Sequence, residues 1–504
     1  MKRLLMVLMS LALLAGCGGG GGSSSSSPSP ASPTTPTTAA DTLTFWADDF
    51  TNNSYYQTTA TKMAEGSHCY IYLEQGAAVT TAEINAVIAQ FDTTVYPKDT
   101  AAFGSEPTPG ADGDPKVYIL LLNVRDGFNA VTSTSYVAGY FDPLNEYPSS
   151  VTHSNQKELL YMNVNSAVVT PANAEFNTTM AHEFQHMIHW EQKEHRLGVS
   201  DDTWLDEGMA TVAGDICGYG PDYETVATYE HAAGHSLTVW EGSAANYGVV
   251  YMWAQYFQDQ FGAGNIFYSM LHNNDTGITE VNTALAAAGT GKTFTSAFRD
   301  WALALYFGNG TTVTAPAGHP EWTYTSINTW PGIYNTIRLP GLFTSTNPTS
   351  LTALQAWGLG FASFTPVSGT AGTVTWTPAT ANEKAWLVDA GGGQVIDLTA
   401  GVPAPYTTKG YLIAQNLAGS AAGSGASVTR TALVPVATPA LAAAAAEPAA
   451  NTVRTAREVL AAVNGNPQLQ AQVQETGRPL HVCIDASLHQ QEQELRNQGI
   501  RPAF

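Results

Sequence analysis

A metal-binding pattern lies in the segment Thr178-Thr179-Met180-Ala181-His182-Glu183-Phe184-Gln185-His186-Met187-Ile188-His189-Trp190. His182 and His186 are four residues apart, so a helix places both imidazoles on one face, one turn apart, where they can share one metal ion. Glu183, beside the first histidine, is placed to reach a metal-bound water rather than the metal itself. Apolar residues at helical spacing predict that the segment is a helix.

The polar run 177–179 is expected to cap this helix at its start, and Gly198 to follow its end. A carboxylate comes next, in Trp204-Leu205-Asp206-Glu207-Gly208, where Glu207 lies 21 residues after His186 (207 − 186). A loop and a second, antiparallel helix fit in that interval and would return Glu207 to the metal as a third ligand. Two histidines, one glutamate and an open fourth position are the ligand set of a catalytic zinc site. The alternative is a surface helix with solvated histidines, and the downstream glutamate disfavours it.

These two motifs, 182–188 and 204–208, resemble the gluzincin group of metallopeptidases. More narrowly, they are similar to the hyicolysin family of secreted bacterial peptidases, and other segments that agree with that family are His68–Tyr72, Phe91-Asp92, Tyr96-Pro97, Asp112–Pro115, Gly139–Phe141 and Asn145–Tyr147. The resemblance covers about residues 66 to 262. It implies that the strand expected at 158–164 is a sheet edge to which extended substrate adds. Many gluzincins carry Asn where this chain has Asp206, a departure that leaves Glu207 in place.

The expected fold class is α+β. A two-lobed zincin metallopeptidase, with a mixed N-terminal sheet and a helical C-terminal lobe, precedes a small all-β sandwich-like domain and a short helical tail. The expected parts are a signal peptide with a lipobox (1–17), a Gly/Ser/Pro/Thr-rich linker (18–42), the peptidase domain (43–345), the β-domain (346–436), an Ala/Pro linker (437–452) and the tail (453–504).

Hydrophobic periodicity predicts individual elements within these parts. Strands are expected at 69–73, 117–122, 158–164, 373–376 and 385–388, and helices at 80–92, 246–261, 293–307, 454–463 and 487–498. Residues 289–293 end like a phosphate-binding loop. A helix is expected before them rather than a strand, so a turn between two helices is the better interpretation.

The first 17 residues have the pattern of a signal peptide, with Lys2 and Arg3 before an apolar run. The run ends in Leu14-Ala15-Gly16-Cys17, which resembles a bacterial lipobox and implies cleavage before Cys17 and a lipid anchor on its sulfur. An ordinary secretory signal is the alternative. Either interpretation predicts an extracytoplasmic protein, as a lipoprotein of the outer membrane or cell surface or as a secreted protein, and membrane contact only through that anchor.

The net charge of −22, from 20 Lys and Arg against 42 Asp and Glu, argues against nucleic acid and against electrostatic binding to anionic lipid. Beyond Cys17 the chain has Cys69, Cys217 and Cys483, for which one disulfide, such as Cys69–Cys217, or three thiols are both open. The carboxylates in residues 112–114 suit Ca²⁺, but too few ligands follow at regular spacing. A turn without metal is favoured, and calcium is not supported.

Peptide hydrolysis needs a donor for the developing oxyanion besides the metal. Tyr247, Tyr251 and His231 are the candidates, and Tyr247 is the one we select. The other histidines, His68, His189, His195 and His235, are expected to be solvated or hydrogen-bonded rather than ligands.

The sequence therefore predicts an endopeptidase with one Zn²⁺ held by His182, His186 and Glu207, acting on extracytoplasmic proteins or peptides. Glu183 is expected to take a proton from the metal-activated water and to pass it to the leaving amine. Two alternatives remain: a surface adhesin or glycan-binding lipoprotein on a protease-like fold, and a zinc aminopeptidase. The sequence does not predict the oligomeric state.

Overall fold

The computed structural model describes residues 41–503 except for the ranges 222–224, 227, 230–233, 309–313, 325–341, 344, 352–353, 367–370, 392, 418–426, 432–459, 461–463, 465–469, 471–478 and 483. The predicted leader, its lipobox and nearly all of the first linker therefore lie outside the described residues. The same holds for the Ala/Pro linker and for almost all of the helix expected at 454–463.

The N-terminal part is a mixed six-stranded sheet in the order β1-β2-β3-β4-β7-β6. Its strands, in that order, are Thr42–Asp49, Ser54–Glu65, Cys69–Glu74, Val117–Leu122, Leu159–Asn163 and Gly139–Phe141. The pairs β3–β4 and β4–β7 are parallel and the other pairs antiparallel. Every residue of β4 is buried, which is typical of a continuous apolar run in the middle of a sheet.

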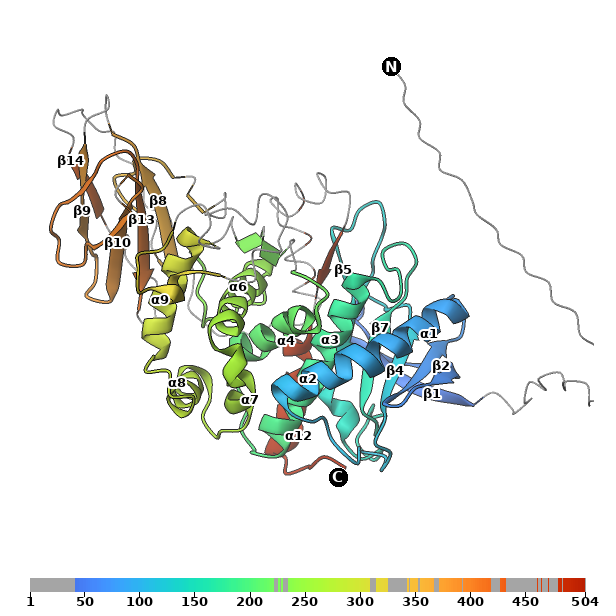
Figure 1. The fold of residues 1–504 in the computed structure, drawn as a ribbon. Coiled ribbons are helices and arrows are strands. Elements are labelled where there is room, and N and C mark those ends of the chain that lie inside the picture. Colours follow the sequence, from blue (N-terminus) through green and yellow to red (C-terminus); the bar gives the residue numbers. More distant parts are fainter. Residues whose placement is uncertain are drawn as a thin grey trace, which may run out of the picture. The chain divides into compact units, whose positions relative to one another are not determined.

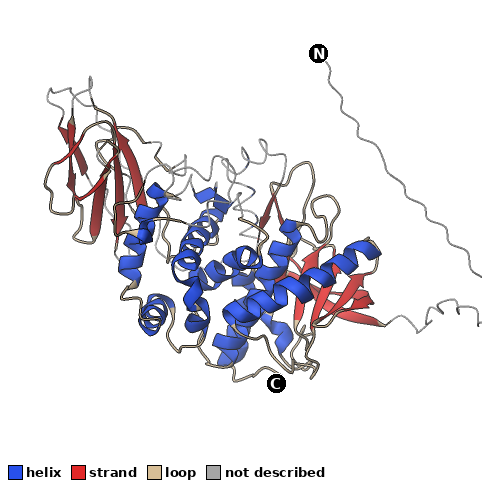
Figure 2. Cartoon of the chain, in the orientation of Figure 1, coloured by secondary structure: helices blue, strands red, loops and turns tan. Residues whose placement is uncertain are grey.

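Helices cover one face of this sheet (Figures 1 and 2). They are α1 (Thr81–Gln90), α2 (Tyr96–Phe103) and α3 (Ala174–His189), with π-helical turns at Phe91–Val95 and Trp190–His195 and a 3₁₀ turn at Pro143–Glu146. Helix α3 begins earlier than the polar run 177–179, because the side chain of Asn173 accepts a hydrogen bond from the amide of Phe176 and caps it there. Residues 177–179 lie inside the helix, so the predicted cap is wrong.

The strand predicted at 158–164 exists as β7, but its predicted place at the sheet edge is wrong. β7 pairs with β4 on one side and with β6 on the other. The short segment Gly139–Phe141 completes the sheet because Gly139 lets β6 pass close to α3: a Cβ there would lie 2.9 Å from the side chain of Thr179. The edge position therefore belongs to β6.

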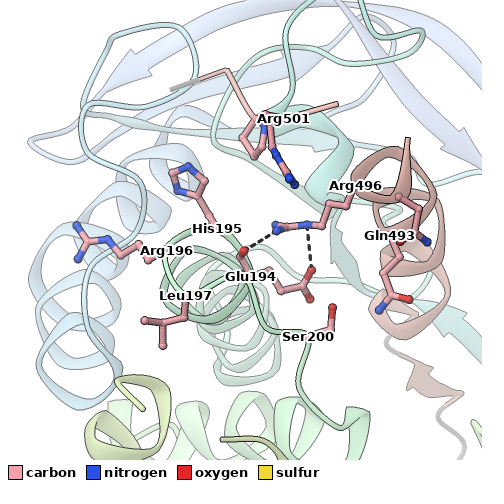
Figure 3. A pocket seen from close by; sticks show the side chains of 11 residues that line it. Glu194, His195, Arg196, Leu197, Ser200, Gln493, Arg496 and Arg501 are labelled. Atoms are coloured by element: carbon pink, nitrogen blue, oxygen red, sulfur yellow. Dashed lines mark hydrogen bonds and ion pairs between the residues drawn. The ribbon is translucent and has the colours of Figure 1, made fainter. Parts of the chain in front are cut away.

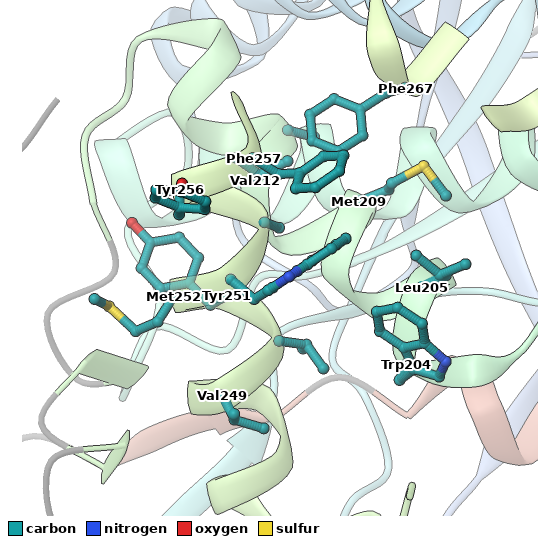
Figure 4. Packing of buried hydrophobic residues seen from close by; sticks show 14 of the residues in the cluster. Trp204, Leu205, Met209, Val212, Val249, Tyr251, Met252, Tyr256, Phe257 and Phe267 are labelled. Carbon is teal, nitrogen blue, oxygen red and sulfur yellow. The ribbon is translucent and has the colours of Figure 1, made fainter. Parts of the chain in front are cut away.

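A helical region follows, consisting of α4 (Thr203–Cys217), α6 (Ala244–Phe261), α7 (Ile266–Leu271), α8 (Gly277–Ala287) and α9 (Phe294–Phe307), with 3₁₀ turns at Gly262–Gly264 and Pro320–Trp322. Large apolar side chains of α4, α6 and α7 pack together in its core, among them Trp204, Met209, Phe257 and Phe267 (Figure 4). The predicted helices 246–261 and 293–307 are confirmed. Residues 289–293 form the turn between α8 and α9 rather than a phosphate-binding loop.

Two antiparallel sheets come next, in the orders β11-β10-β13-β8 and β12-β9-β14. Their strands in chain order are β8 (Leu359–Phe364), β9 (Gly372–Thr377), β10 (Glu383–Asp389), β11 (Gln394–Asp397), β12 (Ala404–Tyr406), β13 (Gly410–Asn416) and β14 (Ser427–Thr431). Side chains from both sheets, including Trp376, Leu387 and Leu412, share one core. The other face of β13 packs on α9, where the rings of Tyr411 and Tyr306 are 5.0 Å apart. Every residue of β13 is buried as a result.

The C-terminal segment returns to the N-terminal part. Strand β15 (Leu480–Val482) pairs in parallel with β5 (Ser135–Val137), and helix α12 (Asp485–Asn497) follows, in agreement with the helix predicted at 487–498. Figure 1 shows this red strand beside β5. Among the described residues, none of the helices combines the length and apolar character that crossing a bilayer requires.

Candidate metal centre

The three predicted metal ligands come together between α3 and α4. His182 and His186 lie one turn apart on α3, and Glu207 projects from α4, which runs antiparallel to it. One ligand atom from each residue lies within 4.8 Å of the other two. The Nε2 atoms of the two histidines are 3.0 Å apart. Oε2 of Glu207 lies 3.5 Å from Nε2 of His182 and 3.7 Å from Nε2 of His186.

The chemistry of this group fits a zinc ion. Two imidazole nitrogens and one carboxylate oxygen converge from three residues that are at most 4% exposed. Burial would raise the pKa of Glu207, but its proximity to the two histidines outweighs that effect and lowers the pKa, so the carboxylate is ionised. Within the described part of the chain, Oε2 of Glu207 makes no hydrogen bond. A buried anionic oxygen facing two nitrogen lone pairs calls for a cation, and two His with one Glu is the donor set of catalytic zinc sites.

Asp206 orients His186. Its Oδ1 lies 2.9 Å from His186 Nδ1 and 3.0 Å from Nδ1 of His189. Burial would raise the pKa of Asp206, but His189 and His186 hold it well below its ordinary value. An ionised Asp206 accepts the Nδ1 proton of His186, which leaves Nε2 with a lone pair directed at Glu207.

His189 is buried between two carboxylates. Its Nε2 lies 3.4 Å from Asp201 Oδ2, on the side away from Asp206. Burial opposes its charged form, but Asp206 and Asp201 outweigh this and raise the pKa of His189 to about 10. The imidazolium therefore compensates the charge of Asp206, and His189 lies outside the group formed by His182, His186 and Glu207.

The three candidates for the oxyanion donor differ in position. The hydroxyl of Tyr247 lies 3.1 Å from Oε1 of Glu207 and donates to it. Tyr251, one turn further along α6, donates to Asp215 at 2.7 Å instead, and His231 lies outside the described residues. Of the two candidates that the structure describes, Tyr247 is the one that contacts a predicted metal ligand.

Several other sequence features have structural partners. The ring of His68 stacks on Tyr96 and that of His195 on Trp190, and Asp112 and Asp114 accept hydrogen bonds from the hydroxyls of Tyr118 and Tyr70. The Asp112 carboxylate also pairs with Lys157 at 2.8 Å. Both aspartates therefore have protein partners without calcium.

Cys69 and Cys217 are both free and buried, so a disulfide between them, one of the options left open, is not formed. Cys483 lies outside the described residues.

Two neighbours of the site were not predicted. The sequence analysis gives Asp206 only as a departure from the family pattern and assigns it no role. Its position directly before Glu207, on the same helical turn, is the sequence feature that could have indicated one. His489, from the C-terminal helix α12, lies with its ring centre 6.3 Å from that of His186. No pattern in the sequence indicates this approach, because some 300 residues separate the two histidines and no metal-binding spacing joins them.

No protein-family model matches this chain. Among known proteins, the neutral metalloprotease ShpI of Staphylococcus hyicus is 30% identical over 247 residues, which is 46% of this chain and 55% of that protein. The chain thus spans about half the length of this relative. It is a homologue of a neutral metalloprotease, and its grouped His182, His186 and Glu207 agree with a zinc site of the gluzincin type.

Proposed function

We propose that the chain is a zinc endopeptidase that hydrolyses proteins or peptides outside the cytoplasm. The observation that carries the proposal is the convergence of His182, His186 and Glu207 with Glu183 on the same turn of α3. The similarity to a neutral metalloprotease supports the same reaction class. We further infer that the N-terminal sheet and the helical region are the two lobes of a zincin fold, with the site between them.

Each residue then has a definite task. His182, His186 and Glu207 would hold the ion, and Asp206 would keep His186 in the tautomer that can bind it. A bound Zn²⁺ supplies Lewis-acid chemistry, since it acidifies water and polarises a carbonyl. Glu183 accepts the proton of the attacking water and donates it to the leaving amine, and Tyr247 donates a hydrogen bond to the developing oxyanion. No covalent intermediate with the protein is required.

The test combines metal content with proteolysis. We expect one zinc per chain, casein cleavage that a chelator abolishes, and a Glu183→Gln variant that retains zinc but loses turnover. Absence of zinc from the purified protein would refute the metal site. Zinc without cleavage of any protein would favour the adhesin alternative, and cleavage of amino-acid amides but not casein would favour the aminopeptidase alternative.

We also propose a lipid anchor on Cys17, supported by the sequence Leu14-Ala15-Gly16-Cys17 and the Gly/Ser-rich tether that follows it. Growth of an expressing bacterium with labelled palmitate tests this. Label should enter the wild-type protein and be absent from a Cys17→Ser variant. Unlabelled wild-type protein in the medium would instead support an ordinary secretory signal.

A further inference from the structure

The C-terminal segment of the chain pairs with β5, the short strand that leads into β6 at the edge of the N-terminal sheet. The carbonyl of Val137 accepts a hydrogen bond from the Asn163 side chain, next to β7, whereas the carbonyl of Thr134 accepts one from the amide of Leu480. The carbonyl of Ala138, between β5 and β6, accepts a hydrogen bond from the amide of Asn163 at 2.9 Å. β15 therefore pairs with the part of this segment that comes directly before its pairing with β7.

This pairing lies next to the position at which an extended peptide would add, the edge strand β6. β5 runs through Ala138 into β6, and β6 is the strand that approaches α3 at Thr179, one turn before Glu183. Because β15 is parallel to β5, the chain after Val482 runs in the direction of β6. A substrate that adds to β6 and the chain's own β15 on β5 would therefore lie along one continuous segment, residues 135–141.

Helix α12 continues along this side as far as the metal centre. Tyr147 donates a hydrogen bond to Glu492 at 2.6 Å, and the guanidinium of Arg496 pairs with Glu492 and Glu194 and lies over the Trp190 ring. His489 Nδ1 is 3.3 Å from Oε1 of Glu194, which places its ring near His186.

The contact between the C-terminal segment and the N-terminal part has an apolar half, at β15 and the start of α12, and a polar half, along the rest of α12. Leu480, Val482, Ile484 and Leu488 are buried in one cluster with Val137 and Tyr140. The helical half is polar and incompletely packed: a cavity of about 750 Å³ separates α12 from the turn after α3, lined by charged side chains such as Arg196 and Arg501 (Figure 3). The side chains of these ion pairs are mostly buried, with Arg496 16% exposed and Glu492 0% exposed. The desolvation of buried charges offsets much of their attraction, so releasing both partners into water together costs little.

In the same arrangement Glu183 and Glu207 are fully buried and His182 is 4% exposed. A protein substrate cannot reach these side chains unless part of the chain moves. We propose that residues 480–482 and 484–502 form an intramolecular inhibitor, which lies along the segment that carries the substrate-binding edge and must be displaced before the peptidase acts. This inference rests on the proposed function.

A cysteine pair across the strands tests it in the full chain. Val137 and Val482 are register partners that share one apolar cluster, so Val137→Cys with Val482→Cys, in a Cys483→Ser background, should form a disulfide that fixes β15 in place. We expect the oxidised zinc-loaded protein to cleave casein at least tenfold more slowly than the same protein after reduction by a phosphine. The Val482→Cys single variant in the same background is the control, and reductant should not change its rate.

A second variant acts in the opposite direction. Arg496→Ala removes the pairs with Glu194 and Glu492, and should raise the rate of casein cleavage severalfold above that of the wild type. Equal rates for the oxidised and reduced cysteine pair would overturn the inhibitor. Absence of cleavage in every form, with zinc bound, would instead remove the proposed function and this inference with it.

Discussion

The carboxylate of Asp206 lies between two imidazoles, 2.9 Å from Nδ1 of His186 and 3.0 Å from Nδ1 of His189. One of these rings belongs to the group His182, His186 and Glu207, and the other is held as a cation by Asp206 and Asp201. Helix α3 therefore presents three histidines, of which two converge with Glu207 and the third compensates the charge of Asp206. Groups that hydrogen-bond to metal ligands orient those ligands and thereby affect the affinity for the metal.

Replacement of Asp206 should weaken zinc binding according to how much of the hydrogen bond survives. Asp206→Ala removes the acceptor for His186 Nδ1 and should lower zinc affinity by about 10- to 100-fold. Asp206→Asn retains a side-chain oxygen at this place and should lose less. Competition with a chromophoric chelator measures both values, and an Asp206→Ala protein that binds zinc as tightly as the wild type would contradict the assigned role.

Replacement of Tyr247 by Phe separates two tasks for its hydroxyl. If it donates to the oxyanion, kcat should fall by about 10²- to 10³-fold while one zinc per chain is retained. Loss of zinc together with activity would mean that its bond to Glu207 holds the ligand instead. Tyr251→Phe is the matched control, because that hydroxyl is bonded to Asp215 and its loss should leave kcat nearly unchanged.

The sequence predicted the site better than its surroundings. His182 and His186 follow from helical spacing, which is local, and Glu207 from the room for a loop and an antiparallel helix after them. β4 follows from a run of apolar residues and α9 from apolar residues at helical spacing. The edge strand was misassigned because Gly139–Phe141 is too short to show a strand pattern, and only its pairing with β7 identifies it. The approach of α12 to His186 arises from pairing between β5 and β15, which are far apart in sequence, and no local periodicity records such a contact.

The free energy of unfolding should depend on pH because two neighbouring carboxyl groups, those of Glu146 and Glu158, are buried. Burial raises the pKa of Glu158 to about 7 from its ordinary value of 4.5, and burial beside Glu158 raises that of Glu146 well above its ordinary value. A raised pKa in the folded state means that the stability contributed by Glu158 is fully present below pH 4.5 and is lost as the pH rises through 7. The free energy of unfolding should therefore decline across this interval.

Chemical denaturation of a Glu158→Gln variant at several pH values provides the test, and the decline should be shallower than in the wild type. Glu83→Gln is a suitable control, because the pKa of the exposed Glu83 is lowered by its capping bonds to Thr80 and its titration falls below this interval. Equal slopes in the Glu158→Gln variant and the wild type would show that the pair does not titrate there.

The packing of α3 against α4, which sets the distance from His182 and His186 to Glu207, depends on a glycine. A Cβ on Gly214 would lie 2.6 Å from Cγ2 of Thr178, too close for any real contact. Gly214→Ala should therefore destabilise the protein by about 1–3 kcal/mol, despite a helix propensity that favours Ala by about 1 kcal/mol. Thr178→Ser removes the obstructing methyl group, and in that background the same change should become neutral or stabilising. A double-mutant cycle by denaturant unfolding measures the coupling, and a Gly214→Ala cost that is equal in both backgrounds would show that this contact does not set the spacing of the two helices.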